Sequence, residues 1–275
     1  MFLDKLLAAS RSQSSLLCVG LDPDPALAPP ALVARPGWVA EFTAAIIEAT
    51  ADLVCAYKPN LAFYEALGGE GWAALRATLA AVPRHIPVIA DGKRGDIGST
   101  ARAYARALFE ELGADAATVS PYLGRDSLEP FLAYPDRAIF VLCKTSNPGA
   151  GELQNLRVCL DGREVPLYQA VAARATTWGP EGGVGLVVGA TYPEDVAAVR
   201  ALAPRMPLLL PGVGAQAGDL RASVRAGVDG AGERLIVSAS RQVLYASRGA
   251  DWLTAARRAA EDLRAAINQA RAEAR

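Results

Sequence analysis

Pro87-Val88-Ile89-Ala90-Asp91-Gly92-Lys93-Arg94-Gly95-Asp96 is a short apolar run that passes directly into charged residues and glycines. An Ala-rich stretch with helical periodicity follows at 101–112, and Gly113 is placed to end that helix. A second apolar run, 116–119, begins immediately afterwards. An apolar strand, a helix and another apolar strand in this order predict a βαβ unit with parallel strands.

The same pattern recurs along the whole chain of 275 residues. The apolar runs are 16–21, 53–57, 87–90, 116–119, 138–142, 184–188, 207–210 and 235–237. Eight such units favour an α/β fold in which one closed (β/α)₈ barrel, the TIM barrel, covers its strands with helices. A doubly wound open sheet is the alternative. Barrels of about 200 to 250 residues form one unit, so we expect residues 1–275 to be a single domain.

Two stretches exceed a minimal barrel, and both follow odd-numbered strands. Residues 23–36 contain five prolines, which predict an extended loop after the first strand. In 156–167, Asp161-Gly162 stands between two β-prone runs and predicts a β-hairpin insertion after strand five. Segments that follow a strand lie at the C-terminal face of a barrel, where active sites are found. The hairpin either helps to enclose a ligand or has no functional role.

The charge balance excludes several classes of protein. The chain has 28 Lys and Arg against 29 Asp and Glu, without the basic patch of a nucleic-acid or membrane-surface protein. We therefore expect no nucleic acid and no membrane among its partners.

Asp4 and Lys5 interrupt the opening residues where a signal peptide needs an apolar stretch. These features predict a cytoplasmic protein, and four cysteines without C-x-x-C spacing predict buried free thiols.

The single histidine, His85, excludes mechanisms that need a histidine pair, such as an H-E-x-x-H zinc site. His85 precedes the third strand, so it belongs to the N-terminal face of a barrel, away from the expected active site. Any proton that the chemistry needs must come from another side chain.

Charged residues gather where the apolar runs end. Asp22 follows the first strand, Lys58 the second, Asp91 and Lys93 the third, and Arg241 the eighth. Residues two apart in a strand project from the same face, so Asp91 and Lys93 are expected to face the barrel mouth together. Alternating lysines and carboxylates suit chemistry in which negative charge develops. Lys58 as an ordinary salt-bridge residue is the alternative to this interpretation.

Asp96 lies three residues beyond Lys93, after Gly95, and taken by itself is more typical of a turn or helix-cap residue.

The loop after the seventh strand, 211–219, is rich in glycine and allows backbone N–H groups to approach an anion. Arg241 begins the helix after the eighth strand. Because the loops after strands seven and eight form the usual phosphate site of such barrels, we predict phosphate binding there.

The D-x-K-x-x-D spacing of Asp91, Lys93 and Asp96 resembles the orotidine 5′-phosphate decarboxylase family in its longer bacterial form. Further motifs occur in family order: 21–23, 57–60, 144–150, the strand-seven loop and Arg241. The resemblance implies conversion of orotidine 5′-monophosphate to uridine 5′-monophosphate and CO₂, in pyrimidine nucleotide biosynthesis. It also implies a homodimer and a reaction without metal or cofactor.

The same resemblance assigns roles to the charged residues. Lys93 would protonate C6 of the pyrimidine, Asp91 would lie beside the substrate carboxylate, and Lys58 would link this array to the ribose hydroxyls. Asp22 would bind the ribose. Asp96, with Ile97 and Thr100, would reach across the dimer interface into the partner's site.

The remaining roles concern the base and the phosphate. Ser146 would bond the amide edge of the pyrimidine, Gln216 would bridge base and phosphate, and Arg241 would clamp the phosphate. The other predicted substrate-binding residues, all in the strand-seven loop, are Pro211, Gly212 and Val213. Ser240 departs from the glycine common before the arginine, which puts the backbone contact to phosphate there in doubt.

Two other functions fit the same barrel. One is a metal-dependent sugar-phosphate decarboxylase or aldolase-like enzyme, which would recruit an additional carboxylate to hold magnesium. Strand two ends in Lys58 rather than an acid, which favours the metal-free reaction. The other is a non-catalytic phosphate-binding barrel.

Overall fold

A computed structural model describes residues 1–212 and 220–274 of the chain. Its main sheet has eight parallel strands in the order β2-β1-β10-β9-β8-β5-β4-β3. The strands are β1 (Leu17–Leu21), β2 (Ala56–Pro59), β3 (Ile89–Arg94), β4 (Ala116–Val119), β5 (Ala138–Lys144), β8 (Val184–Val188), β9 (Leu208–Pro211) and β10 (Leu235–Ala239). Bridges between Tyr57 and Val88 and between Asn60 and Asp91 join β2 to β3. The ring therefore closes, which confirms the predicted barrel and excludes an open doubly wound sheet.

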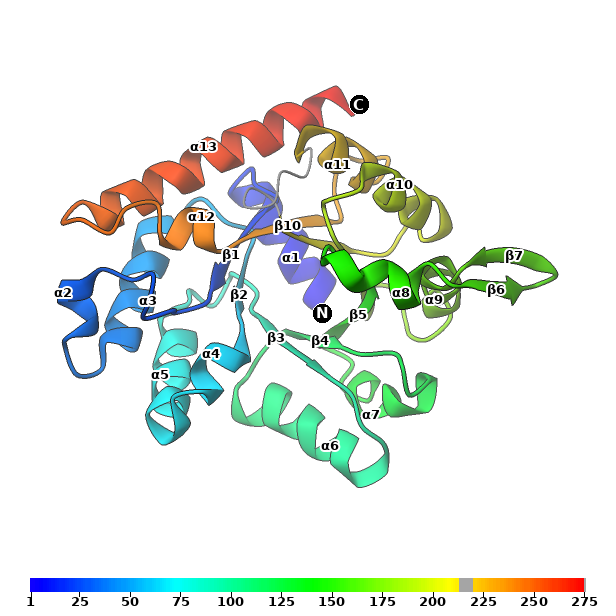
Figure 1. The fold of residues 1–275 in the computed structure, drawn as a ribbon, viewed down its shortest axis with the longest axis horizontal. Helices are drawn as coiled ribbons and strands as arrows, with labels where there is room; N and C mark the ends of the chain where they lie inside the picture. Colours follow the sequence, from blue (N-terminus) through cyan, green and yellow to red (C-terminus); the bar gives the residue numbers. More distant parts are fainter. Residues whose placement is uncertain (213–219, 275) are drawn as a thin grey trace.

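Helices surround the ring of strands (Figure 1). They are α3 (Trp38–Thr50), α4 (Leu61–Glu65), α5 (Gly68–Ala81), α6 (Gly98–Arg106), α7 (Glu129–Leu132), α9 (Leu167–Ala175), α10 (Pro193–Leu202), α11 (Leu220–Gly227), α12 (Arg241–Leu244) and α13 (Trp252–Glu273). The long C-terminal helix α13 is amphipathic. Its buried residues recur at alternating spacings of four and three: Ala256, Ala260, Leu263, Ile267 and Ala270.

The N-terminal helix α1 (Phe2–Ser12) closes one end of the barrel. The ring of Phe2 packs edge-on against Phe140 in β5, with 5.7 Å between ring centroids. Lys5 Nζ bonds the carboxylate of Asp115, just before β4, at 2.8 Å. Apolar burial and one ion pair together fix this helix across the end where the strands begin.

The side chains inside the barrel change character along the strands. Side chains two apart share a face, so each strand contributes one inward residue per layer. The lower layer includes Ala56, Ile89 and Ala116, and the next layer on the same strands has Lys58, Asp91 and Thr118. The barrel interior is therefore apolar near α1 and charged at the C-terminal ends of the strands.

The predicted hairpin is present as β6 (Arg157–Leu160) and β7 (Arg163–Pro166). Asp161 and Gly162 have φ angles of 49° and 78°, the left-handed pair that a two-residue type I′ turn requires. The hairpin projects outward beyond α9 (Figure 1). Short helical turns, η3 (Pro148–Ala150) and α8 (Gly151–Gln154), connect β5 to it.

The loop after β1 differs from the prediction of a wholly extended segment. It contains a one-turn helix, α2 (Pro30–Val33), which Pro30 starts because proline is pre-set for the first helical position. Two other irregular turns lie elsewhere: α6 continues into a π-turn, η1 (Ala107–Glu111), and a 3₁₀ turn, η2 (Arg125–Ser127), follows β4.

The cysteines are free, and three of them are buried as predicted, whereas Cys159 on β6 is exposed. Burial raises the pKa of the Cys18 thiol to about 12.

His85 is exposed in the turn before β3. Within residues 1–212 and 220–274, none of the helices has the length and apolarity needed to span a membrane.

Arg200 in α10 connects the loops at the end of the barrel where β9 and β10 begin. Its side chain is largely buried, with 8% exposure. The guanidinium donates to carbonyl oxygens of Gly227 (2.8 Å), Ala203 (3.0 Å), Pro204 (3.3 Å), Met206 (2.7 Å) and Arg234 (3.0 Å). Burial lowers the pKa of Arg200 to about 10, so the side chain stays charged at neutral pH.

We expect Arg200→Lys to lower the free energy of unfolding by about 2–3 kcal/mol. A lysine ammonium group cannot donate hydrogen bonds to all the carbonyl oxygens that the planar guanidinium contacts at once. Urea unfolding followed by circular dichroism measures this loss. Arg205→Lys, at a neighbouring exposed arginine, is the matched control and should change the value by less than about 0.5 kcal/mol. Equal effects of the two substitutions would contradict the role assigned to Arg200.

Candidate active site

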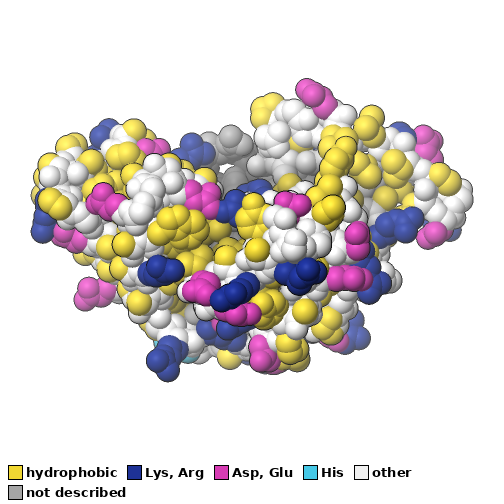
Figure 2. Space-filling view, turned by 90° about the horizontal axis from the view of Figure 1, so that it is seen from below, with side chains coloured by type: hydrophobic (Ala, Val, Ile, Leu, Met, Phe, Trp, Pro, Cys, Tyr) yellow, Lys and Arg dark blue, Asp and Glu magenta, His cyan; other side chains and the backbone are white. Residues whose placement is uncertain are grey.

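A cavity of about 230 Å³ opens at the C-terminal ends of the strands. Its lining includes five residues predicted to bind substrate or take part in catalysis: Asp22, Lys58, Pro211, Gly212 and Arg241. Figure 2 shows the molecule hollowed at its upper edge, with basic side chains at the base of the hollow. The structure thus brings together residues from β1, β2, β9 and the start of α12.

Asp91 lies between two lysines beside this cavity. Its Oδ2 accepts a hydrogen bond from Lys58 Nζ at 2.6 Å, and its Oδ1 accepts one from Lys93 Nζ at 2.7 Å. Lys58 and Asp91 are buried, whereas the side chain of Lys93 is 46% exposed at the mouth. The array therefore has a fixed inner part and one ammonium group that a bound molecule can reach.

The charges of this array support one another. Burial by itself would raise the pKa of the Asp91 carboxyl, but the ammonium groups of Lys58 and Lys93 outweigh it and hold this pKa well below its ordinary value. Burial would likewise lower the pKa of Lys58, but the attraction of Asp91 and Asp22 raises it above its ordinary value. Asp91 and Lys58 are therefore both charged near neutral pH.

The backbone at Lys93 departs from the regular strand that the sequence suggested. Its φ of 46° lies in the left-handed region, which costs a non-glycine residue roughly 1–2 kcal/mol. The pairing of β3 with β4 also shifts register between Ala90 and Arg94. Asp91 and Lys93 do meet, as predicted, but through this irregular turn and not through simple strand alternation.

Arg94 has its partners outside the array. It forms a salt bridge with Glu65 in α4, and its guanidinium lies over the ring of Tyr104, 5.3 Å from the centroid. This arginine is a structural neighbour of the site and not a member of it.

Asp22 is held at the other side of the cavity, after β1. Its Oδ1 accepts a hydrogen bond from the backbone N–H of Asn60 at 3.2 Å. The hydroxyl of Tyr245 donates to the carbonyl of Asp22 at 2.7 Å and accepts from the N–H of Asp24 at 2.6 Å. These contacts fix the loop that presents the Asp22 carboxylate.

Of the residues predicted to bind phosphate, Pro211, Gly212 and Arg241 line the same cavity, and Ser240 lies beside them in its lining. Gly212 has a φ of 89°, which suits glycine and turns the chain after β9. The side chain of Ser240 packs closely on Gly20, where an added Cβ would lie 1.9 Å from Ser240 Oγ. Val213 and Gln216, also predicted to bind substrate, lie outside the described residues.

Ser146, after β5, packs against two glycines of neighbouring strand ends. An added Cβ on Gly189 would lie 2.8 Å from the Ser146 nitrogen, and one on Gly212 would lie 3.2 Å from its Oγ. The preceding residue is fixed as well, since the Thr145 N–H donates to Gln154 Oε1 at 2.9 Å. Ser146 therefore stands beside the glycine of the predicted phosphate loop but is not among the described residues that line the cavity, and its contact with the base stays a prediction.

Asp96, Ile97 and Thr100 are not among the residues that line the cavity of their own chain. Asp96 Oδ1 accepts from the backbone N–H of Ile97 at 2.8 Å, which is the turn role considered from the sequence. Ile97 is 60% exposed and Thr100 is exposed too. The role of these residues in a partner's site stays a prediction.

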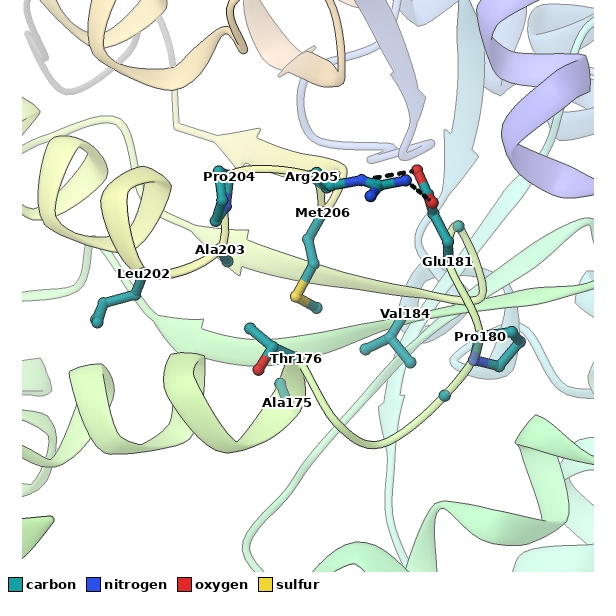
Figure 3. A pocket seen from close by; sticks show the side chains of 12 residues that line it. Ala175, Thr176, Pro180, Glu181, Val184, Leu202, Ala203, Pro204, Arg205 and Met206 are labelled. Atoms are coloured by element: carbon teal, nitrogen blue, oxygen red, sulfur yellow. Dashed lines mark hydrogen bonds and ion pairs between the residues drawn. The ribbon is translucent and has the colours of Figure 1, made fainter. Parts of the chain in front are cut away.

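A second pocket of about 360 Å³ lies between the ends of α9 and α10, where β8 and β9 begin. Figure 3 shows its charged residues, Glu181 and Arg205, pointing toward one another. Their charges are paired, and most other side chains around them are apolar or small: Ala175, Val184, Leu202, Ala203 and Met206. This pocket lacks the charge array and lies at the opposite end of the barrel.

Thr118 and Tyr245 also support the site, although the sequence pattern did not indicate them. Thr118 is buried in β4 and donates to Asp91 Oδ1 at 2.8 Å. A polar residue in an otherwise apolar strand, two residues beyond an inward alanine, was the available signal. Tyr245 offered no comparable signal, because its partners lie more than 200 positions away in the sequence.

Comparisons with known proteins agree with this geometry. The model of the orotidine 5′-phosphate decarboxylase / HUMPS family matches residues 15–259. The orotidine 5′-phosphate decarboxylase of Roseiflexus castenholzii is 57% identical over 270 residues, which cover 98% of each protein. That of Herpetosiphon aurantiacus is 53% identical over 95% of this chain and 96% of its own. The solved structure of Leishmania donovani OMP decarboxylase is 47% identical, with a TM-score of 0.84 and 98% of both chains covered.

We expect Asp91→Asn to lower the free energy of unfolding by about 3 kcal/mol at pH 7, because it leaves the buried Lys58 ammonium without its main partner. The folded pKa of Asp91 lies below its unfolded value of about 3.9, so its contribution is complete above that value and is lost as pH falls through the folded pKa. The difference between the two proteins should therefore narrow below about pH 4.

Urea unfolding at pH 7, 5 and 3 measures this dependence. Asp161→Asn, in the exposed hairpin turn, is the matched control and should have little effect at any of these pH values. A difference between Asp91→Asn and the unsubstituted chain that stays constant down to pH 3 would contradict the charge assignment.

Proposed function

The chain belongs to the orotidine 5′-phosphate decarboxylase / HUMPS family, and we propose that it converts orotidine 5′-monophosphate to uridine 5′-monophosphate and CO₂ in pyrimidine nucleotide biosynthesis. The observation that carries this proposal is the Lys58–Asp91–Lys93 array beside the cavity. The array places one accessible ammonium group next to a carboxylate that is held ionised.

The chemistry explains why such an array is useful. Loss of CO₂ leaves the bonding electron pair on C6 of the pyrimidine. The substrate has no electron sink for this pair of the kind that a pyridoxal or thiamine cofactor provides. Stabilisation must then be electrostatic and already in place. Lys93 supplies a cation where this negative charge develops and then gives C6 its proton. The charge on Asp91 repels the carboxylate of the bound substrate, which leaves as neutral CO₂.

The rest of the cavity orients the substrate. Arg241 and the backbone after β9, beginning with Pro211 and Gly212, bind the phosphate. Asp22 and Lys58 bind the ribose hydroxyls, and Ser146 bonds the base. These contacts are remote from C6, so their binding energy fixes the reacting carbon against Lys93.

We further propose that the reaction needs neither metal nor cofactor. Both oxygens of Asp91 already accept from ammonium groups, and β2 offers Lys58 where a magnesium enzyme would need an additional carboxylate. A metal-dependent sugar-phosphate decarboxylase or aldolase-like enzyme is therefore disfavoured. We also propose a cytoplasmic location, since the doubly charged phosphate of the substrate does not cross a lipid bilayer unaided.

The assembly that we propose is a homodimer. Asp96 has no ion pair among the described residues and lies beside the exposed apolar Ile97 and the exposed Thr100. A second copy that covers these side chains would bury Ile97 and bring the Asp96 carboxylate to the partner's ammonium array. Each site would then contain two aspartates and two lysines, with charges in balance.

We expect Lys93→Ala to lower kcat by about 10³-fold or more, because it removes both the stabilising cation and the proton donor. Decarboxylation is followed by the loss of substrate absorbance. Lys5→Ala, which removes a lysine at the opposite end of the barrel, is the matched control and should keep kcat within about twofold. Full activity of Lys93→Ala would contradict the role of Lys93 as stabilising cation and proton donor.

Turnover abolished by a chelator and restored by magnesium would favour the metal-dependent alternative.

The dimer proposal predicts complementation between two inactive variants. A mixture of Asp96→Asn and Lys93→Ala chains should recover activity, because in a hybrid dimer one of the two shared sites carries neither substitution. Subunit exchange is verified with two affinity tags before the assay. Verified exchange without recovery would mean that Asp96 acts within its own chain.

A further inference from the structure

The pairing of β3 with β4 is irregular beside the charge array. Ala90 pairs with Ala117 and Arg94 pairs with Val119. Between these pairs β4 has the single residue Thr118, whereas β3 has three residues. Extra residues in one strand leave backbone N–H groups without partners in the other strand, and such groups need another acceptor.

The hydroxyl of Thr118 is that acceptor. It accepts hydrogen bonds from the backbone N–H of Gly92 at 3.1 Å and of Lys93 at 2.9 Å. It donates its own proton to Asp91 Oδ1 at 2.8 Å. A hydroxyl has one donor and two acceptor positions, so all three are in use.

These bonds fix the geometry of the reactive lysine. Lys93 has a left-handed φ of 46°, a conformation that persists only where neighbouring structure imposes it. Thr118 binds the nitrogen of this residue and also one oxygen of Asp91, the same oxygen that Lys93 Nζ contacts at 2.7 Å. The hydroxyl of Thr118 thus fixes the backbone of Lys93 and the carboxylate of Asp91 directly, and the ammonium group of Lys93 through that carboxylate.

We propose that Thr118 is a positioning residue for the decarboxylation: its hydroxyl holds the strained backbone of Lys93 and the carboxylate of Asp91 so that the ammonium group faces C6. This inference rests on the proposed function and extends it. Thr118 is buried and has no free hydrogen-bonding position, so it acts through Lys93 and Asp91 without touching the substrate.

The test compares Thr118→Val, which keeps the shape of the side chain and removes the hydroxyl, with Thr118→Ser, which keeps the hydroxyl. Thr43→Val is the matched control. Thr43 is equally buried and bonds the hydroxyl of Thr78 at 2.6 Å, far from the array. For each protein, kcat and KM for orotidine 5′-monophosphate and the urea unfolding midpoint are measured.

We expect Thr118→Val to lower kcat about 10- to 100-fold, with KM changed less than about threefold, because the ribose and phosphate contacts are untouched. Thr118→Ser should recover kcat to within about threefold of the unsubstituted chain. Thr43→Val should lower the unfolding midpoint and keep kcat. A purely structural role for Thr118 would instead lower the midpoint alone.

Unchanged kcat in folded Thr118→Val, or a Thr118→Ser enzyme as slow as Thr118→Val, would overturn the proposal. Absence of turnover in the unsubstituted chain would instead overturn the proposed function. A crystal structure of the Thr118→Val protein tests the positioning role independently of the activity measurements. In Thr118→Val, a Lys93 residue that keeps its left-handed φ and its contact with Asp91 would overturn it, and a displaced one would support it.

Discussion

The carboxylate of Asp91, placed between two ammonium groups inside the end of a barrel, is the constraint on which the rest of the site depends. Burying a charge is costly unless it is paired and hydrogen-bonded. Asp91 meets this condition through Lys58, Lys93 and Thr118, which take both of its oxygens. Asp91 and Lys58 stay charged although they are buried, because each has a partner of opposite charge, so the electric field of the array is set before any substrate binds.

The barrel separates this costly arrangement from the parts that stabilise it. At the end where strands begin, α1 packs Phe2 into the interior, and Arg200 satisfies carbonyl groups of several loops. The layer between the two ends is made of buried apolar side chains. The Lys58–Asp91–Lys93 array and the left-handed backbone of Lys93 lie at the C-terminal ends of the strands, which is where barrels of this kind place their chemistry.

The sequence predicted the fold because its signals are local and repeated. Eight apolar runs alternate with helical stretches, and Asp161-Gly162 specifies its own turn wherever the hairpin lies. The charged strand ends were predictable for the same reason: once the strands are parallel, their C-terminal ends meet at one mouth. Asp22, Lys58 and Arg241 accordingly line one cavity although they are far apart in the sequence.

The backbone of Lys93 could not be predicted in this way, because its conformation depends on a different strand. No local rule says that three residues of β3 will face one residue of β4. That arrangement becomes possible only when a buried side chain on β4 can accept the released N–H groups, and Thr118 does so. The regular-strand rule failed at Lys93, where the neighbouring strand enforces a conformation that the local sequence disfavours.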